Sequence, residues 1–276
     1  MTRWAAFAGV TLAVLILLLV LARASQHALS NGSAFVTSEE RRWLDRLPDG
    51  SGHLDTAAAP RPHRMTPAEA TLVPDGSMST VALLANVAVS HGLFALLLLG
   101  GIWLTDVPWP TLGVSAEPLS TGLPAVVLGV SLGVALSFAN TLAGGLARAF
   151  GADPSEELRG MLAPETAAGW AVLLLVVLPV IAGFEELLFR AALVGAFSVG
   201  FELSPWLLAV LSSAAFAVGH GAQGPLGVVV TGLLGLVLAV AFVLTNSLLV
   251  VIVAHYVVNA VEFVVFEGLG WEPFGG

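Results

Sequence analysis

The chain has 276 residues, of which 57% are hydrophobic and only 11% are charged. A soluble globular domain carries about 25% charged residues, so this composition excludes that class and indicates an all-α, polytopic membrane protein. The net charge of −9 argues against a nucleic-acid partner, and the absence of cysteine excludes disulfides and thiolate chemistry.

A membrane-spanning helix needs about 20 consecutive apolar residues. Eight segments approach or reach this length, which predicts about eight transmembrane helices in a multi-pass protein of the cell membrane. Almost no loop separates the last four. The segments are residues 4–22, 80–104, 122–147, 167–184, 187–201, 205–221, 225–244 and 247–266.

The basic residues indicate how the chain is oriented in the bilayer. All ten are arginine, and eight of them lie in two loops, residues 23–79 and 148–166, whereas loop 105–121 has none. Because cytoplasmic loops are enriched in basic residues, the first and third loops are predicted to be cytoplasmic and the second external.

The first segment has two interpretations. Ala22, Arg23 and Ala24 resemble the cleavage site of a signal peptide, but the preceding apolar run of residues 5–22 is longer than usual for such a peptide. We expect residues 1–22 to form an uncleaved N-terminal transmembrane helix, with cleavage as the alternative.

The remaining boundaries follow from composition. Residues 23–79 read as a cytoplasmic loop in which 48–79, rich in Pro, Gly and Ser, is a flexible linker. Within it, 37–47 has the pattern of a short interfacial helix, and a solvated helical linker is the alternative. Residues 80–119 hold the second transmembrane helix and a loop, 120–266 a membrane-embedded core, and 267–276 a short tail.

Three charged residues stand inside the apolar stretch at residues 183–193, GFEELLFRAAL. A charge at mid-membrane costs about 2.5–3.5 kcal/mol, so each is a candidate functional residue. Glu186 and Arg190 are spaced i, i+4, which favours an ion pair that braces the helix. Glu185 points about 100° away and has no cation nearby in the sequence, and such a carboxylate can act as a general base near neutral pH.

Two histidines and an amide lie in the later apolar segments. His220 ends the stretch FAVGH, which begins at Phe216, and His255 and Asn259 are spaced i, i+4 on one helix face. Burying these groups and Glu185 separately would leave several hydrogen bonds unmet. We therefore expect the four side chains to converge on one hydrated intramembrane cavity. The remaining histidines are expected to be solvated in the first loop or, for His91, to have a structural role in the second span.

Such a cavity could support hydrolysis in two ways. Glu185 and His220 could activate a water while His255 and Asn259 stabilise an oxyanion, or Glu185, His220 and His255 could hold a zinc ion that activates the water. The H-E-x-x-H metalloprotease motif, a G-x-S-x-G elbow and paired intramembrane aspartates are all absent from the sequence. A proton-coupled transporter is a further alternative, although inverted repeats are not visible.

The order of these motifs resembles a known family. E-E-x-x-x-R at Glu185, Glu186 and Arg190 is followed by F-x-x-x-H at Phe216 and His220, and then by H-x-x-x-N at His255 and Asn259. This series resembles the CPBP family of CAAX-protease and bacteriocin-processing (Abi) intramembrane proteases, which are related to the type II CAAX prenyl endopeptidase. The resemblance covers roughly residues 120–266.

The resemblance implies an eight-helix membrane fold with a cavity open to one leaflet and to the cytoplasm. It implies water activation by Glu185 and His220, an oxyanion site at His255 and Asn259, and a supporting role for Glu186, Arg190 and Phe216. The cofactor is then zinc or none. The expected partners are the lipid bilayer and a membrane-associated protein or peptide substrate, and the alternative is a non-catalytic scaffold or immunity protein.

Overall fold

The computed structural model describes residues 1–32, 80–149 and 157–271. Residues 1–26 and those from Thr80 onward form one compact unit, and residues 27–79 form a second. The expected interfacial helix at 37–47, the linker at 48–79 and residues 272–276 of the tail lie outside the described residues. Every candidate site residue lies in the first unit.

The described residues are helical from end to end, with short connections. The helices are α1 (Trp4–Gly32), α4 (Thr80–Thr105), η1 (Trp109–Leu112), α5 (Pro118–Thr121), α6 (Leu123–Ala149), α7 (Glu157–Leu162), α8 (Ala167–Val172), η2 (Leu173–Val177), α9 (Leu178–Glu186), η3 (Leu187–Ala196), α10 (Phe197–Gly200), α11 (Pro205–Gly219), η4 (Gly221–Gln223), α12 (Gly224–Thr245), α13 (Leu248–Glu262) and η5 (Phe263–Gly268).

Six helical stretches in the described part of the chain are long and apolar enough to cross a membrane, and the apolar helix Pro205–Gly219 is shorter. Their outward faces carry large apolar side chains, such as Trp103 at 77% and Leu175 at 73% exposure. Lipid is the solvent that suits these faces. The expected all-helical, multi-pass membrane fold is confirmed.

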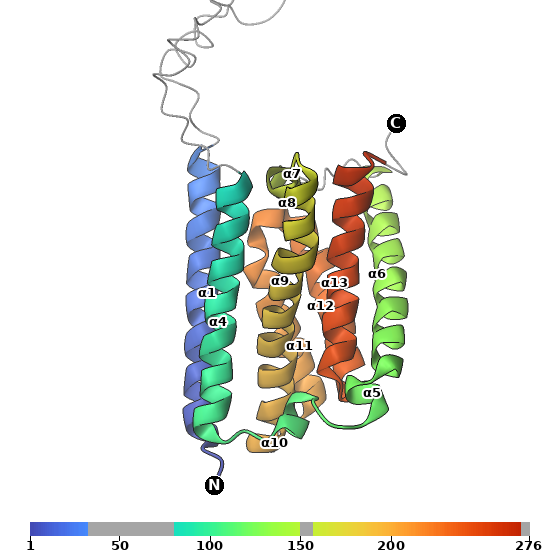
Figure 1. Ribbon diagram of the computed structural model, residues 1–276. Helices are drawn as coiled ribbons and strands as arrows, with labels where there is room; N and C mark the ends of the chain where they lie inside the picture. Colours follow the sequence, from blue (N-terminus) through green and yellow to red (C-terminus); the bar gives the residue numbers. More distant parts are fainter. Residues whose placement is uncertain (33–79, 150–156, 272–276) are drawn as a thin grey trace, which may run out of the picture. The chain divides into compact units, whose positions relative to one another are not determined.

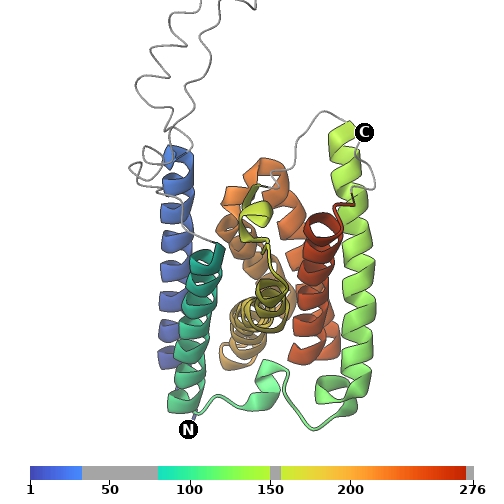
Figure 2. The same ribbon diagram turned by 45° about the horizontal axis from the view of Figure 1, so that its top comes forward.

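The two ends of the bundle carry different connections. Figure 1 shows α5 and α10 at one end and α7 at the opposite end, and Figure 2 shows the same helices with the α7 end turned forward. Loop 105–121 therefore lies opposite the arginine-containing connection at α7, as the arginine distribution predicts.

The expected division of residues 167–201 into two spans is wrong. A single helical stretch of 34 residues runs from Ala167 to Gly200 and includes the charged cluster. The charges do not break the helix because Glu186 and Arg190 are fully buried and paired with each other. At about 1.5 Å per residue, this stretch is longer than the ~30 Å hydrocarbon core.

Two π-helical segments interrupt this long stretch. The first, η2, ends two residues before Pro179, which cannot donate a hydrogen bond to the carbonyl of Leu175. The second, η3, begins directly after Glu186, and all ten of its residues are buried. π-Segments are frequent at functional sites, where they change the direction of side chains within a helix.

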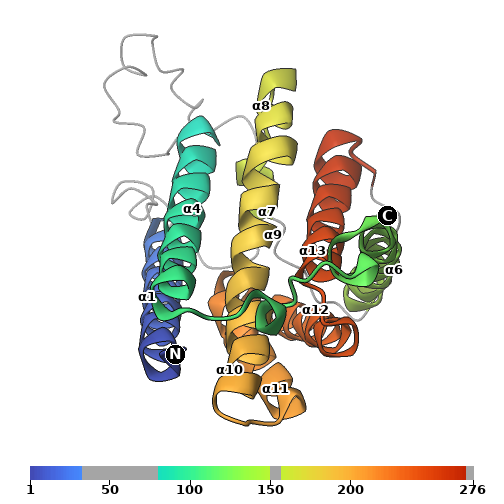
Figure 3. The same ribbon diagram turned by 60° about the horizontal axis from the view of Figure 1, so that its bottom comes forward.

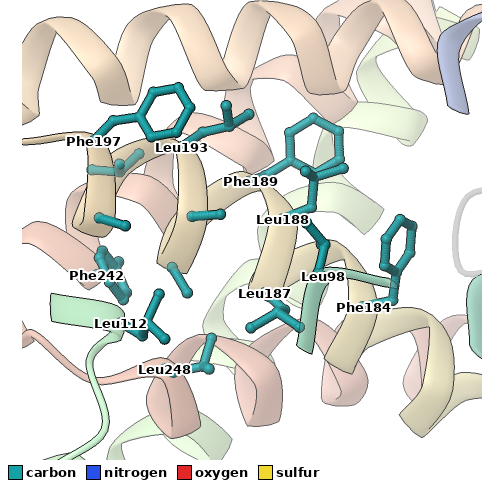
Figure 4. Packing of buried hydrophobic residues seen from close by; sticks show 14 of the residues in the cluster. Leu98, Leu112, Phe184, Leu187, Leu188, Phe189, Leu193, Phe197, Phe242 and Leu248 are labelled. Atoms are coloured by element: carbon teal, nitrogen blue, oxygen red, sulfur yellow. The ribbon is translucent and has the colours of Figure 1, made fainter. Parts of the chain in front are cut away.

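The buried apolar residues of η3 form the centre of an apolar core. Figure 4 shows Leu187, Leu188, Phe189 and Leu193 of η3 among side chains from neighbouring elements. Leu98 from α4, Leu112 from η1, Phe242 from α12 and Leu248 from α13 belong to the same cluster. Phe184 and Leu187, which flank Glu185 and Glu186 in the sequence, belong to this cluster as well.

The helix α11 is too short to cross the bilayer. Ser204 caps it by accepting a hydrogen bond from the N–H of Leu207, Pro205 follows, and the helix ends at Gly219. Fifteen residues extend over about 22 Å, less than the ~30 Å apolar thickness. Figure 3 shows α11 beside α10, which Figure 1 shows at the end opposite α7. The connection that follows α11, which begins with His220, is therefore placed at membrane depth.

Close packing fixes α13, which carries His255 and Asn259, against α6. A Cβ atom on Gly129 would lie 2.7 Å from the carbonyl oxygen of Val250, and one on Gly133 would lie 2.6 Å from the Cβ of Val257. Small residues four apart allow two membrane helices to approach this closely.

We expect Gly133→Val to destabilise the protein by about 1–3 kcal/mol because the added side chain cannot fit against α13. Unfolding in detergent measures the loss. Gly100→Val on α4 is the matched control, since nothing lies within 4 Å of a Cβ there. Equal losses for the two variants would contradict close α6–α13 packing.

Candidate active site

The Glu185 carboxylate lies between two histidines from different helices. Its Oε1 is 3.7 Å from Nε2 of His91 on α4, and its Oε2 is 3.6 Å from Nε2 of His255 on α13. The residue is 7% exposed. Oε2 is buried and accepts no hydrogen bond from the described residues. The hydrogen-bonding capacity of that oxygen is therefore unmet by the described residues.

Glu186 forms a buried ion pair that also orients His255. Its Oε1 accepts hydrogen bonds from Nη1 of Arg190 at 2.9 Å and from Nδ1 of His255 at 2.7 Å. Nη2 of Arg190 donates to the carbonyl of Gly235 at 2.8 Å, and the guanidinium lies over the ring of Phe216. Because Nδ1 of His255 is occupied, its Nε2 is the ring atom turned toward Glu185.

His220 is held by the turn that ends α11. Its Nδ1 donates to the carbonyl of Phe216 at 2.8 Å, and the two rings lie 4.4 Å apart. The four-residue spacing in FAVGH therefore has a physical reason, since it places the ring over the last helical turn. Nε2 of His220 is left free for chemistry.

The start of α13 explains how His255 and Asn259 are placed. Asn246 adopts a left-handed conformation with φ 46° and ends α12, and Ser247 caps α13 by accepting from the N–H of Val250. His255 is buried at 4% exposure, and Asn259, one turn later, is half-buried.

A cavity of about 430 Å³ connects these groups. Glu185, His220, His255 and Asn259 all line it, so the four side chains that the sequence grouped do share one space. Apolar and small side chains complete the wall: Leu178, Ile181, Leu226, Gly227, Val230, Leu234, Val258, Phe263, Phe266, Ala143 and Gly144. A water molecule occupies about 30 Å³ of liquid, so the polar part has room for several.

The polar side chains of Asn140, Arg159 and Glu262 also line the cavity. Asn140 of α6 donates to Oε1 of Glu262, and Nε of Arg159 of α7 donates to Oε1 of Glu267 at 2.7 Å. Arg159 also lies over the ring of Phe266. Since α7 lies at one end of the bundle, this cluster marks that end of the cavity.

His91 is the site residue that sequence reasoning missed, because it was interpreted as a structural histidine of the second span. It lines the cavity and approaches Glu185 directly. The signal that could have found it is the rule applied to the other histidines, that a polar group within a span needs a partner.

The alternative zinc set does not fit the observed arrangement. Within the described ranges, no three His, Asp or Glu side chains are grouped so that they could hold a metal ion. Glu185, His220 and His255 therefore share a cavity without forming a ligand set.

Part of the chain matches the model of a known protein family. Residues 167–261 match the family model described as type II CAAX prenyl endopeptidase Rce1-like. Comparison with curated proteins and with solved structures finds no match. The matched segment contains Glu185, Glu186, Arg190, Phe216, His220, His255 and Asn259, and the resemblance to the CPBP proteases is confirmed over this segment. His91, α4 and α6 lie outside it.

Proposed function

We propose, from the match of residues 167–261 to the Rce1-like family, that this protein is an intramembrane endopeptidase. It hydrolyses a peptide bond of a membrane-associated substrate near the surface that the α7 end faces. CAAX-type processing is the substrate class that the family description suggests. The observation that carries the proposal is the buried Oε2 of Glu185, which accepts no hydrogen bond from the described residues, in a cavity that Glu185 shares with His220, His255 and Asn259.

Water activation is assigned to Glu185 and His220. A water held between them loses a proton to Glu185 as its oxygen attacks the scissile carbonyl carbon. The proton then passes to the leaving amine as the C–N bond breaks, which regenerates the carboxylate. The fixed Nδ1–H of His220 leaves Nε2 free to orient the water.

Oxyanion stabilisation is assigned to His255 and Asn259. The amide N–H of Asn259 donates to the developing oxyanion, and Nε2 of His255 does so when the ring carries both protons. Glu186 supports this role because it fixes Nδ1 of His255 at 2.7 Å and can balance a positive ring charge.

The apolar wall of the cavity suits the membrane anchor of a substrate. Leu226, Val230 and Leu234 of α12 face the same space as Phe263 and Phe266 of η5. These side chains can bind an apolar chain by excluding it from water. The polar cluster around Arg159 then lies toward the aqueous side, where the peptide enters.

The proposed chemistry is tested with the purified protein in liposomes and a panel of membrane-tethered peptides. Hydrolysis in ¹⁸O-labelled water should place the label in the new carboxyl terminus. Hydroxylamine should trap no acyl-enzyme, because water attacks directly. A hydroxylamine-trapped product would instead indicate a covalent intermediate, and absence of cleavage across the panel would remove the support for proteolysis.

Cleavage should persist after dialysis against a strong chelator, because Glu185, His220 and His255 do not form a metal-ligand group. Metal analysis of the dialysed protein gives the control. Loss of activity that zinc restores, together with about one bound zinc per chain, would contradict the metal-free assignment.

A further inference from the structure

We propose that His91 of α4 is a positioning residue for Glu185. This inference rests on the proposed function, and it concerns a residue outside the segment that matches the family. His91 lines the cavity, and its Nε2 lies 3.7 Å from Oε1 of Glu185. Because Nδ1 gives its hydrogen to the carbonyl of Val87, Nε2 donates toward Oε1 when the ring carries both protons, and it then holds that oxygen while Oε2 remains for the substrate water.

The His91 ring is itself fixed on two sides. Its Nδ1 lies 2.9 Å from the carbonyl of Val87, which accepts the Nδ1 hydrogen, and its ring packs edge-on against Phe184 at 5.4 Å. Phe184 directly precedes Glu185 in α9. The ring can therefore neither flip nor slide along α4 without losing one of these contacts, and Nε2 is its remaining polar edge.

Among the residues that the structure describes, the ion-pair contacts of Glu185 are with His91 and His255, and His91 is the one from α4. Oε1 faces His91 and Oε2 faces His255 at 3.6 Å, so the carboxylate is placed between two rings from opposite sides. Without His91, the side chain regains rotamer freedom and spends less time in the reactive orientation. Misplacement of a reacting group by about 1 Å can cost up to 10²-fold in rate.

Contacts other than that of His91 also hold α4 against α9. Phe94 and Phe184 lie 5.7 Å apart, and Leu98 is fully buried in the same core. A variant that replaces the imidazole by an apolar side chain should therefore keep the helices together. Its effect on activity then reports the contact with Glu185.

Three variants measured in the liposome assay test the inference. His91→Leu should lower kcat by about 10- to 100-fold and leave KM within about twofold. His91→Gln, whose amide can donate to Oε1, should recover much of the loss. Ser90→Ala is the matched control, because its hydroxyl reaches Nδ1 of His91 at 3.4 Å but is not among the residues that line the cavity. Full activity of His91→Leu, or an equal loss in Ser90→Ala, would overturn the inference.

Infrared difference spectra provide a readout that does not require hydrolysis. The carboxylate band that disappears in Glu185→Gln should shift in His91→Leu and remain in place in Ser90→Ala. An unshifted band in His91→Leu would overturn the positioning role. The failures of the two proposals can be told apart. Full activity of Glu185→Gln would contradict the proposed function. An inactive Glu185→Gln variant together with a fully active His91→Leu variant would contradict only the positioning role of His91.

Discussion

Replacing Glu185 by glutamine is expected to lower kcat for peptide hydrolysis by about 10²- to 10⁴-fold, the usual contribution of a positioned general base. The glutamine keeps the size of the side chain and a hydrogen-bonding group near His91 and His255, but it cannot accept the proton of the attacking water. Cleavage of a membrane-tethered peptide by the protein in liposomes gives the rate.

The fold should survive this change. Oε2 of Glu185 has no hydrogen-bond partner within the described residues, so thermal stability in detergent should be kept or should rise. Glu267→Gln is the matched control, because it makes the same chemical change in a residue that pairs with Arg159 and is not among the residues that line the cavity. Full activity of Glu185→Gln would contradict the assignment of Glu185 as the general base. If Glu185→Gln is strongly destabilised and the wild type hydrolyses no peptide, the scaffold alternative is favoured.

Replacing Arg190 by leucine is expected to destabilise the protein by about 3–5 kcal/mol, because it leaves the charge of Glu186 buried without its partner. Both side chains are 0% exposed, and Arg190 is among the largest fully buried side chains in the described residues. Equilibrium unfolding in detergent, with the wild type beside it, measures the difference.

A double variant is the control for this experiment. Glu186→Gln combined with Arg190→Leu removes both charges and should recover part of the stability lost in Arg190→Leu alone. Arg159→Leu should cost less than Arg190→Leu, because Arg159 and Glu267 keep exposures of 17% and 21%. A double variant less stable than Arg190→Leu would show that Glu186 is stabilised by groups other than Arg190.

Much of the fold follows from the sequence because lipid imposes simple conditions on it. Long apolar segments must be helices, and polar residues within them must find partners. These two conditions identify the membrane fold and, for Glu185, His220, His255 and Asn259, the shared cavity. The pair of Glu186 and Arg190 follows from its i, i+4 spacing alone.

Other features depend on distant contacts that a local pattern does not contain. The charges at 185, 186 and 190 suggested a break between two spans, but their burial in the bundle allows one helix from Ala167 to Gly200. His91 looked structural because Glu185, its partner, comes 94 residues later in the chain. The pairing of Arg159 with Glu267 joins elements more than 100 residues apart for the same reason.

The apolar core around η3 has a consequence for the cell that contains this protein. Leu112, Phe197, Phe242 and Leu248 belong to this core, and α10, which holds Phe197, lies at the end of the bundle opposite α7. Ions and protons do not cross densely packed hydrocarbon. A packed core at that end would let the bundle hold water in its cavity without opening a path for ions through the bilayer.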